Sequence, residues 1–154
     1  MPGDELRALF RDVPAPVAVV TVEAGGESIG LTVSSFVSLS LEPPLVGVAV
    51  SRQAALHELL RGAGAFAVSV LAAGQERLAQ HFARGVPPIG LWTGIETREG
   101  TLGAPLLDGA LGWIECRLAE EHETGDHTLF VGEVATVERG PGREALVHLR
   151  QGYS

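Results

Sequence analysis

Strand-like runs that follow one another across very short turns are the feature that most limits the fold of this chain. Val17–Val22 is a run rich in β-branched residues that leads into a turn with two glycines. Leu111–Glu121 and Thr128–Glu138 are two longer runs, separated by a short segment that contains Gly125 and Asp126. Tight turns join antiparallel strands, because parallel neighbours need a crossover of a dozen residues or more. The pattern therefore favours a mainly β, antiparallel fold.

The rest of the chain adds strands and a few helices. The longest strand pattern is Ile29–Leu41, which ends before Pro43 and Pro44. The other predicted strands are Leu45–Val50, Phe66–Leu71 and Leu146–Leu149, and the predicted helices are Asp4–Asp12, Ala54–Leu60 and Gln75–Arg84, with a loop-rich segment over 85–110. About seven strands and three helices suit a single domain of this length. We predict one domain over residues 1–154, an antiparallel, Greek-key-like β-barrel with flanking helices.

Composition excludes several classes of protein. Hydrophobic residues make up 45% of the chain and charged residues 19%, so apolar side chains suffice for a core. The net charge of −8 argues against a surface for nucleic acid or an anionic membrane, because both need clustered cations. Cys116 is the only cysteine, which excludes an intramolecular disulfide and a cysteine-based metal centre.

The N-terminus and the apolar runs bear on location. Met1 to Glu5 is acidic and lacks the basic and then apolar pattern of a signal peptide. The apolar runs stay below the roughly 18 residues that a membrane span needs. We therefore expect a cytoplasmic protein without a membrane segment.

Hydroxyl side chains recur at alternate positions in the longest strand pattern. In an extended chain, Thr32, Ser34, Phe36, Ser38 and Ser40 share one face, and the opposite face is mainly aliphatic. We expect the aliphatic face to belong to the core. Two interpretations of the hydroxyl face stay open: it faces water, or it lines a polar ligand, where small side chains let a planar ring approach the backbone.

Five segments, taken in order, connect the chain with a known family. They are Gly30–Leu45, Phe66–Gln75, Phe82–Arg84, Gly125–His127 and Gly152–Tyr153. The first resembles the hallmark segment of the flavin reductase-like family, which includes the small reductase components of two-component flavin monooxygenases. The resemblance covers nearly the whole chain, and five segments in register are specific although no single one is decisive.

The resemblance implies a split β-barrel that pairs as a homodimer, with the flavin near the subunit interface. It implies an NAD(P)H-dependent flavin oxidoreductase that binds FMN, or FAD, and uses NADH or NADPH as a transient substrate. Reduced flavin would then diffuse to a partner monooxygenase. Two alternatives stay open: a flavin-binding electron carrier without NAD(P)H activity of its own, and a structural dimer that has lost its cofactor.

The resemblance also implies which residues contact the flavin. They are Thr32, Val33, Ser34, Ser35 and Ser38 along the ring, Ser51, Arg52 and Gln53 toward the phosphate, and Arg84 after the third predicted helix. Arg52 also makes chemical sense, because a guanidinium can bind a phosphate monoester through two hydrogen bonds. Its alternative is a solvated loop arginine.

The chain departs from the family at one place. Ala54, Ala55 and Leu56 stand where many relatives carry Ser-x-Thr near the phosphate. Two phosphate-binding hydroxyls are therefore missing, which leaves the choice between FMN and FAD open.

The segment Gly125, Asp126, His127 carries the candidate for chemistry. By similarity it lies beside the flavin and is associated with nicotinamide binding, which makes His127 the predicted catalytic residue. A tight turn would hold His127 at the barrel rim, where an imidazole can donate a hydrogen bond or a proton near neutral pH. Tyr153 is predicted either to close over the cofactor or to pack at the dimer interface. The acids and histidines around this turn diverge, so we predict no metal site.

Overall fold

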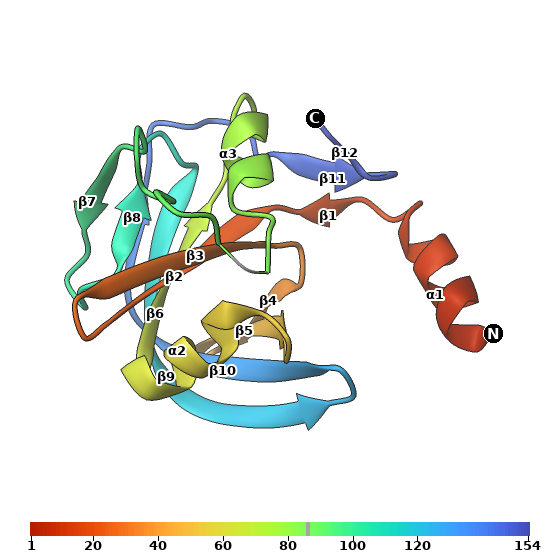
Figure 1. The fold of residues 1–154 in the computed structure, drawn as a ribbon, viewed down its shortest axis with the longest axis horizontal. Coiled ribbons are helices and arrows are strands. Elements are labelled where there is room, and N and C mark those ends of the chain that lie inside the picture. The colour runs from red at the N-terminus through yellow and green to blue at the C-terminus, as the bar shows by residue number, and fades with distance from the viewer. Residues whose placement is uncertain (86) are drawn as a thin grey trace.

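The computed structural model describes residues 1–85 and 87–154, and its regular structure is mainly β (Figure 1). The helices are α1 (Pro2–Phe10), α2 (Ala55–Ala63) and α3 (Glu76–His81). The strands are β1 (Ala15–Pro16), β2 (Ala18–Ala24), β3 (Glu27–Val33), β4 (Phe36–Leu41), β5 (Pro44–Ser51), β6 (Ala65–Val70), β7 (Thr97–Glu99), β8 (Pro105–Leu107), β9 (Gly112–Thr124), β10 (His127–Arg139), β11 (Val147–Leu149) and β12 (Gly152–Tyr153).

Seven of these strands form one antiparallel sheet in the order β3-β2-β6-β9-β10-β5-β4. Strands β1, β11 and β12 form a small second sheet, and β7 pairs with β8. The predictions of a mainly β fold and of antiparallel pairing are therefore confirmed. The predicted hairpins at Gly25 and at Gly125 are present as β2–β3 and β9–β10.

The prediction of one long strand over Ile29–Leu41 is wrong. β3 ends at Val33 beside β2, and β4 begins at Phe36 beside β5, so the chain changes partners across Ser34 and Ser35. β3 and β4 stand at opposite ends of the seven-stranded order. Three residue steps span at most about 10 Å, so the two ends of the sheet must curve toward each other. The sheet thus forms a barrel that is split at Ser34–Ser35, as the predicted fold class requires.

The core lies inside this curved sheet. Strand β2, between β3 and β6, is fully buried over Ala18–Val22, and α2 packs mainly against it. α2 contributes Leu56, His57 and Leu60 to the interior. The helix ends at Gly64, whose φ of +69° allows its N–H to donate to the Leu60 carbonyl. The position of the first turn of α2 is therefore fixed by the core beneath it.

The expected burial of the aliphatic side of Ile29–Leu41 is correct for β3 and wrong for β4. Leu31 and Val33 are buried, whereas Val37, Leu39 and Leu41 are exposed. The reason is the change of partner: β4 is an edge strand on the outside of the barrel. A single copy of the chain thus presents an apolar edge to water.

Helix α1 also keeps an apolar face outside the core. Figure 1 shows α1 standing away from the barrel beyond β1. Leu6, Leu9 and Phe10, spaced three and four residues apart as on one side of a helix, are all exposed. None of the helices within residues 1–85 and 87–154 has the length and apolarity to cross a membrane.

Candidate functional site

A cleft of about 580 Å³ opens where the barrel is split. It brings together the end of β3, the Ser34–Ser35 crossing, the end of β5, the segment before α2, the segment after α3 and the first residue of β10. Its lining residues are Leu31, Thr32, Val33, Ser34, Ser35, Ala49, Ser51, Gln53, Ala54, Ala83, Gly85 and His127. The volume lies within the usual range for small-molecule sites.

The cleft combines apolar walls with a few hydrogen-bonding groups. Two of its hydroxyls fix its shape: Thr32 Oγ1 donates to the Ala79 carbonyl at 2.7 Å, and Ser35 Oγ donates to the Ala49 carbonyl at 2.7 Å. The Thr32 N–H also donates to the Phe82 carbonyl at 2.8 Å, which ties the segment after α3 to β3. The hydroxyl row is therefore partly structural, and its oxygens can still accept hydrogen bonds from a ligand.

His127 stands at one side of the cleft because of the turn before it. Gly125 has a φ of +74°, which suits the first central position of a two-residue hairpin turn. The imidazole is half-buried, and its Nδ1 lies 2.7 Å from Asp126 Oδ1. This hydrogen bond lowers the pKa of the Asp126 carboxyl, so the carboxylate accepts and Nδ1 carries the hydrogen. His127 Nε2 is then the ring nitrogen that can form a hydrogen bond with a ligand.

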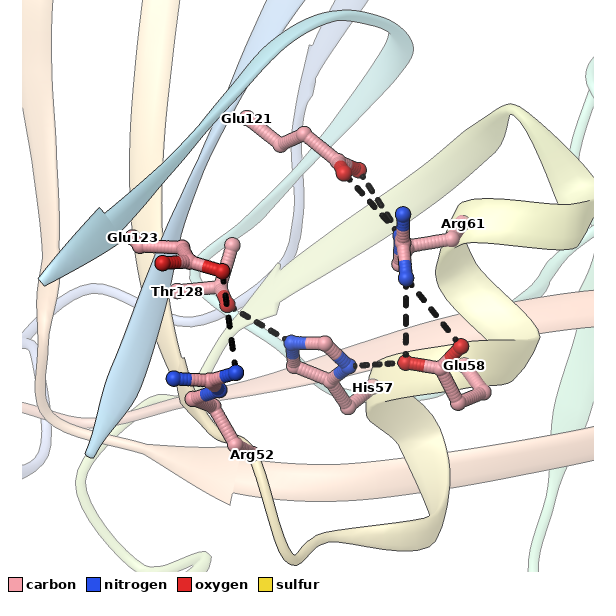
Figure 2. Close-up of a pocket in the computed structure, with 7 residues that line it drawn as sticks. All are labelled: Arg52, His57, Glu58, Arg61, Glu121, Glu123 and Thr128. Carbon is pink, nitrogen blue, oxygen red and sulfur yellow. Dashed lines mark hydrogen bonds and ion pairs between the residues drawn. The ribbon is translucent and has the colours of Figure 1, made fainter. Parts of the chain in front are cut away.

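A second, smaller cavity of about 230 Å³ lies between α2 and the β9–β10 hairpin (Figure 2). Its centre is His57 of α2, which is buried and is bonded to Glu58 and to Thr128. Its lining residues are Arg52, His57, Glu58, Arg61, Glu121, Glu123 and Thr128. Arg52 is paired with Glu123, and Arg61 is paired with both Glu58 and Glu121.

Arg52 belongs to this second cavity. Its N–H donates to the Asp126 carbonyl at 3.0 Å, and its Nη1 donates to the Gly125 carbonyl at 3.4 Å. Its Nη2 lies 3.6 Å from Glu123 Oε1. The guanidinium therefore wraps the turn that carries His127. The predicted phosphate contact would require it to leave these partners.

Comparison with known proteins gives the family. The model of the flavin reductase like domain matches residues 10–154 of the chain. The chain belongs to this family. The NADH-dependent FAD reductase of Streptomyces globisporus is 46% identical over 147 residues, which cover 93% of this chain and 80% of that protein. The reductase component of 4-hydroxyphenylacetate 3-monooxygenase from Thermus thermophilus is 45% identical over 137 residues, covering 89% and 85%.

A solved structure of this family has the same fold. The NADH:FAD oxidoreductase of Streptomyces globisporus C-1027, in complex with NAD and FAD fragments, superposes with a TM-score of 0.93 at 41% identity. The match covers 100% of this chain and 93% of that one. The family assignment made from the five sequence segments is thus confirmed.

The structure gathers only part of the predicted site at the cleft. The predicted residues that line it are Thr32, Val33, Ser34, Ser35, Ser51, Gln53 and His127. Gly125 and Asp126 form the turn beside it. Ser38 is itself exposed on β4 and is not among the lining residues, and Arg84 is exposed between two lining residues. Their predicted contacts therefore need a further movement or a second copy of the chain.

Tyr153 also lies apart from the lining. It ends the chain's last strand, β12, half-buried against the core, with its ring 5.1 Å from that of His148. Burial raises the pKa of its phenol. The choice between a cofactor cover and an interface residue stays a prediction.

Several lining residues were not predicted. Ala54, which was predicted to lie near the phosphate as a departure from the family pattern, lines the cleft as well; the unpredicted lining residues are Leu31, Ala49, Ala83 and Gly85. All are apolar or lack a side chain, so no chemical group drew attention to them. The only available signal was position, because each is next to, or within two residues of, a predicted contact.

Proposed function

We propose that the chain is an NAD(P)H-dependent flavin reductase, and that the cleft at the split of the barrel holds the flavin. The observation that carries the proposal is the meeting of the Thr32–Ser35 segment and His127 on one cleft of suitable size. These two segments are almost one hundred residues apart in the sequence and resemble the family's flavin and nicotinamide segments. The two Streptomyces globisporus proteins described above are named as an NADH-dependent FAD reductase and an NADH:FAD oxidoreductase.

The chemistry of the lining fits a flavin. Leu31, Val33 and Ala49 offer apolar surface for a planar ring, and Ser34 and Ser35 offer hydrogen bonds near its polar edge. Ser51 and Gln53 lie just before α2, whose N-terminus carries a partial positive charge suited to a phosphate. When bound, a flavin accepts hydride from NAD(P)H and carries the redox chemistry itself.

The contribution of the protein is then to orient the flavin and the nicotinamide relative to each other. β3 is held by β2, and β5 is held by β4 and β10, so a bound ring would lie between two strands that their neighbours fix in place. His127 would contact the nicotinamide: its Nε2 accepts a hydrogen bond when the ring is neutral and donates one when it is protonated. Asp126 keeps the imidazole in one orientation.

The direct test mixes the purified chain and oxidised FMN with NADH under anaerobic conditions in a stopped-flow instrument. We expect rapid loss of the flavin's visible absorbance, slowed in His127→Ala. Unchanged absorbance would refute the reductase function. Retained flavin binding without reduction would identify the electron carrier, and a melting temperature insensitive to excess FMN or FAD would identify the cofactor-free dimer.

A homodimer and an oxygenase partner complete the proposal. The apolar faces of β4 and of α1 support a homodimer, because a second copy would remove Leu39, Leu41 and Phe10 from water. Size-exclusion chromatography with light scattering tests it, and Leu39→Glu is expected to give monomers. The Thermus thermophilus relative is named as a reductase component, which supports delivery of reduced flavin to a partner monooxygenase.

Two other expectations stay proposals. We treat residues 1–154 as one functional domain, which agrees with the span of the family match. The cytoplasmic location expected from the sequence also stays a prediction, and fractionation of cells that express the chain would test it.

A further inference from the structure

His57 is an unusual residue for the buried side of α2. It is 6% exposed and shares the interior with Leu56 and Leu60. A buried imidazole is costly unless its polar atoms have partners, whereas a leucine needs none. Both ring nitrogens have partners: Nδ1 lies 2.5 Å from Glu58 Oε2, and Nε2 lies 2.7 Å from Thr128 Oγ1.

The direction of these hydrogen bonds follows from Glu58. The hydrogen bond with His57, supported by Arg61, lowers the pKa of the Glu58 carboxyl, so this group accepts. Nδ1 therefore donates, and when the ring is neutral Nε2 accepts from the Thr128 hydroxyl. Arg61 pairs with the Glu58 carboxylate and also with Glu121 of β9, where its Nε lies 3.0 Å from Glu121 Oε1. Arg61 thus connects Glu58 to β9.

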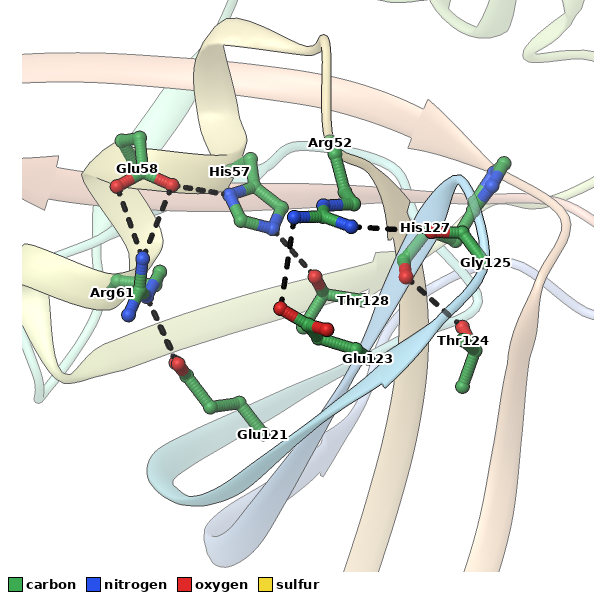
Figure 3. Close-up of polar contacts among 10 residues, drawn as sticks. All are labelled: Arg52, His57, Glu58, Arg61, Glu121, Glu123, Thr124, Gly125, His127 and Thr128. Atoms are coloured by element: carbon green, nitrogen blue, oxygen red, sulfur yellow. Dashed lines mark hydrogen bonds and ion pairs between the residues drawn. The ribbon is translucent and has the colours of Figure 1, made fainter.

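Thr128 connects this network to the cleft. It follows His127 directly on β10, and successive side chains of a strand point to opposite faces. Figure 3 shows the Thr128 side chain directed toward His57 and the His127 side chain directed away from it. The two residues pair with Val50 and Ser51 of β5, so they share one rigid register.

The main chain of His57 is also bonded to a residue of the cleft lining. The His57 N–H donates to the carbonyl of Ala54, which lines the cleft, at 3.1 Å. The backbone of the first turn of α2 thus connects His57 with the cleft lining, while the His57 imidazole bonds to Thr128 of β10. Neither Thr128 nor His57 is among the residues that line the cleft.

We infer that His57 is a positioning residue, which acts through Thr128 to set where His127 lies beside the cleft. The inference rests on the proposed function, because it gives His127 a role toward the nicotinamide. Among the described residues, the hydrogen bonds of this network join α2 to β9 and β10 and include none to Thr32, Ser34 or Ser35. Loss of the network should therefore affect the nicotinamide far more than the flavin.

Kinetics of three variants test the inference. Thr128→Val keeps the shape of the side chain and removes the hydroxyl, and His57→Leu removes both hydrogen bonds. We expect each to raise the KM for NADH about tenfold, the scale of one lost hydrogen bond, with the flavin KM within about twofold. In His57→Gln an amide oxygen can still accept from Thr128, so we expect the KM for NADH to return close to that of the parent.

Thr21→Val is the matched control. Thr21 is a buried threonine of the same sheet, and its hydroxyl donates to the Pro105 carbonyl at 2.6 Å, away from the cleft. It should lower the melting temperature much as Thr128→Val does, without changing the KM for NADH. An equal KM change in the control, or equal changes for NADH and flavin, would overturn the inference.

Two further measurements separate a positioning role from general damage. In a His127→Ala background, Thr128→Val should add nothing to the KM for NADH, because the effect passes through His127. In the ligand-free chain, the NMR signals of the His127 ring should move in Thr128→Val and stay in Thr21→Val; unmoved signals in Thr128→Val refute the inference. This spectrum needs no activity, so it decides the inference even if the parent chain fails to reduce flavin.

Discussion

Replacing Ala54 by serine tests two consequences of the first turn of α2 at once. Ala54 occupies the N-cap position in an extended conformation, with φ −75° and ψ 140°, and provides no side-chain cap. It also lines the cleft at the end assigned to the phosphate. A serine hydroxyl there can accept from a free helix N–H through its oxygen and donate to a phosphate through its hydrogen.

The two effects have separable sizes. Serine in place of alanine at an N-cap stabilises a protein by about 1 kcal/mol. For a domain of this size, that raises the melting temperature by about 2–4 °C. A hydrogen bond to a charged phosphate contributes about 1.5–3 kcal/mol, so the Kd for FMN should fall about tenfold or more.

Calorimetry of the ligand-free chain measures the first effect, and fluorescence titration with FMN and riboflavin measures the second. Riboflavin lacks the phosphate, so its Kd should stay within about twofold of the parent value. Ala55→Ser is the control, because it adds the same hydroxyl one position later, outside the cleft lining. Equal tightening of FMN and riboflavin, or an equal gain in the control, would show that the phosphate does not lie at this turn.

Three other outcomes follow from the structure. Gly132→Ala would place a Cβ 2.5 Å from Cys116 Cβ and 2.6 Å from Phe66 Cζ, so we expect a loss of about 1–3 kcal/mol by calorimetry. The pKa of Glu58 is lowered, chiefly by its hydrogen bond with His57, so its contribution exists above its ordinary value of 4.5 and is lost as pH falls further; the melting temperatures of Glu58→Gln and the parent should converge there. Burial raises the pKa of Cys116 to about 12, so a thiol reagent should label it only after unfolding.

Turns were the most predictable part of this fold. Gly25 and Gly125 both adopt positive φ at hairpins, and local sequence alone signals such positions. The break at Ser34 and Ser35 gave no such signal, because serines fit a strand and neither glycine nor proline interrupts 31–41. The change of partner there is decided by closure of the sheet, which is a long-range property.

The residues of the site also fall into those that local sequence could identify and those that depend on long-range packing. Thr32–Ser35 and His127 could be found because each segment resembles a family motif and carries reactive or hydrogen-bonding groups. The role of Arg52 could not, because its choice between cleft and turn depends on Glu123, seventy-one positions along the chain. His57 looked unremarkable in sequence, since its partner Thr128 becomes a neighbour only when α2 packs against the sheet.

Because the chain crosses between the two borders of the sheet at Ser34–Ser35, a ligand in the cleft would also stabilise the barrel. Residues of β3, at one border of the sheet, and of β5, next to the opposite border, line the same space. A molecule bound there would contact both borders, so separating the borders would cost the free energy of its binding. Without a ligand, we expect local opening to begin between these two borders of the sheet, and we expect flavin binding to suppress it.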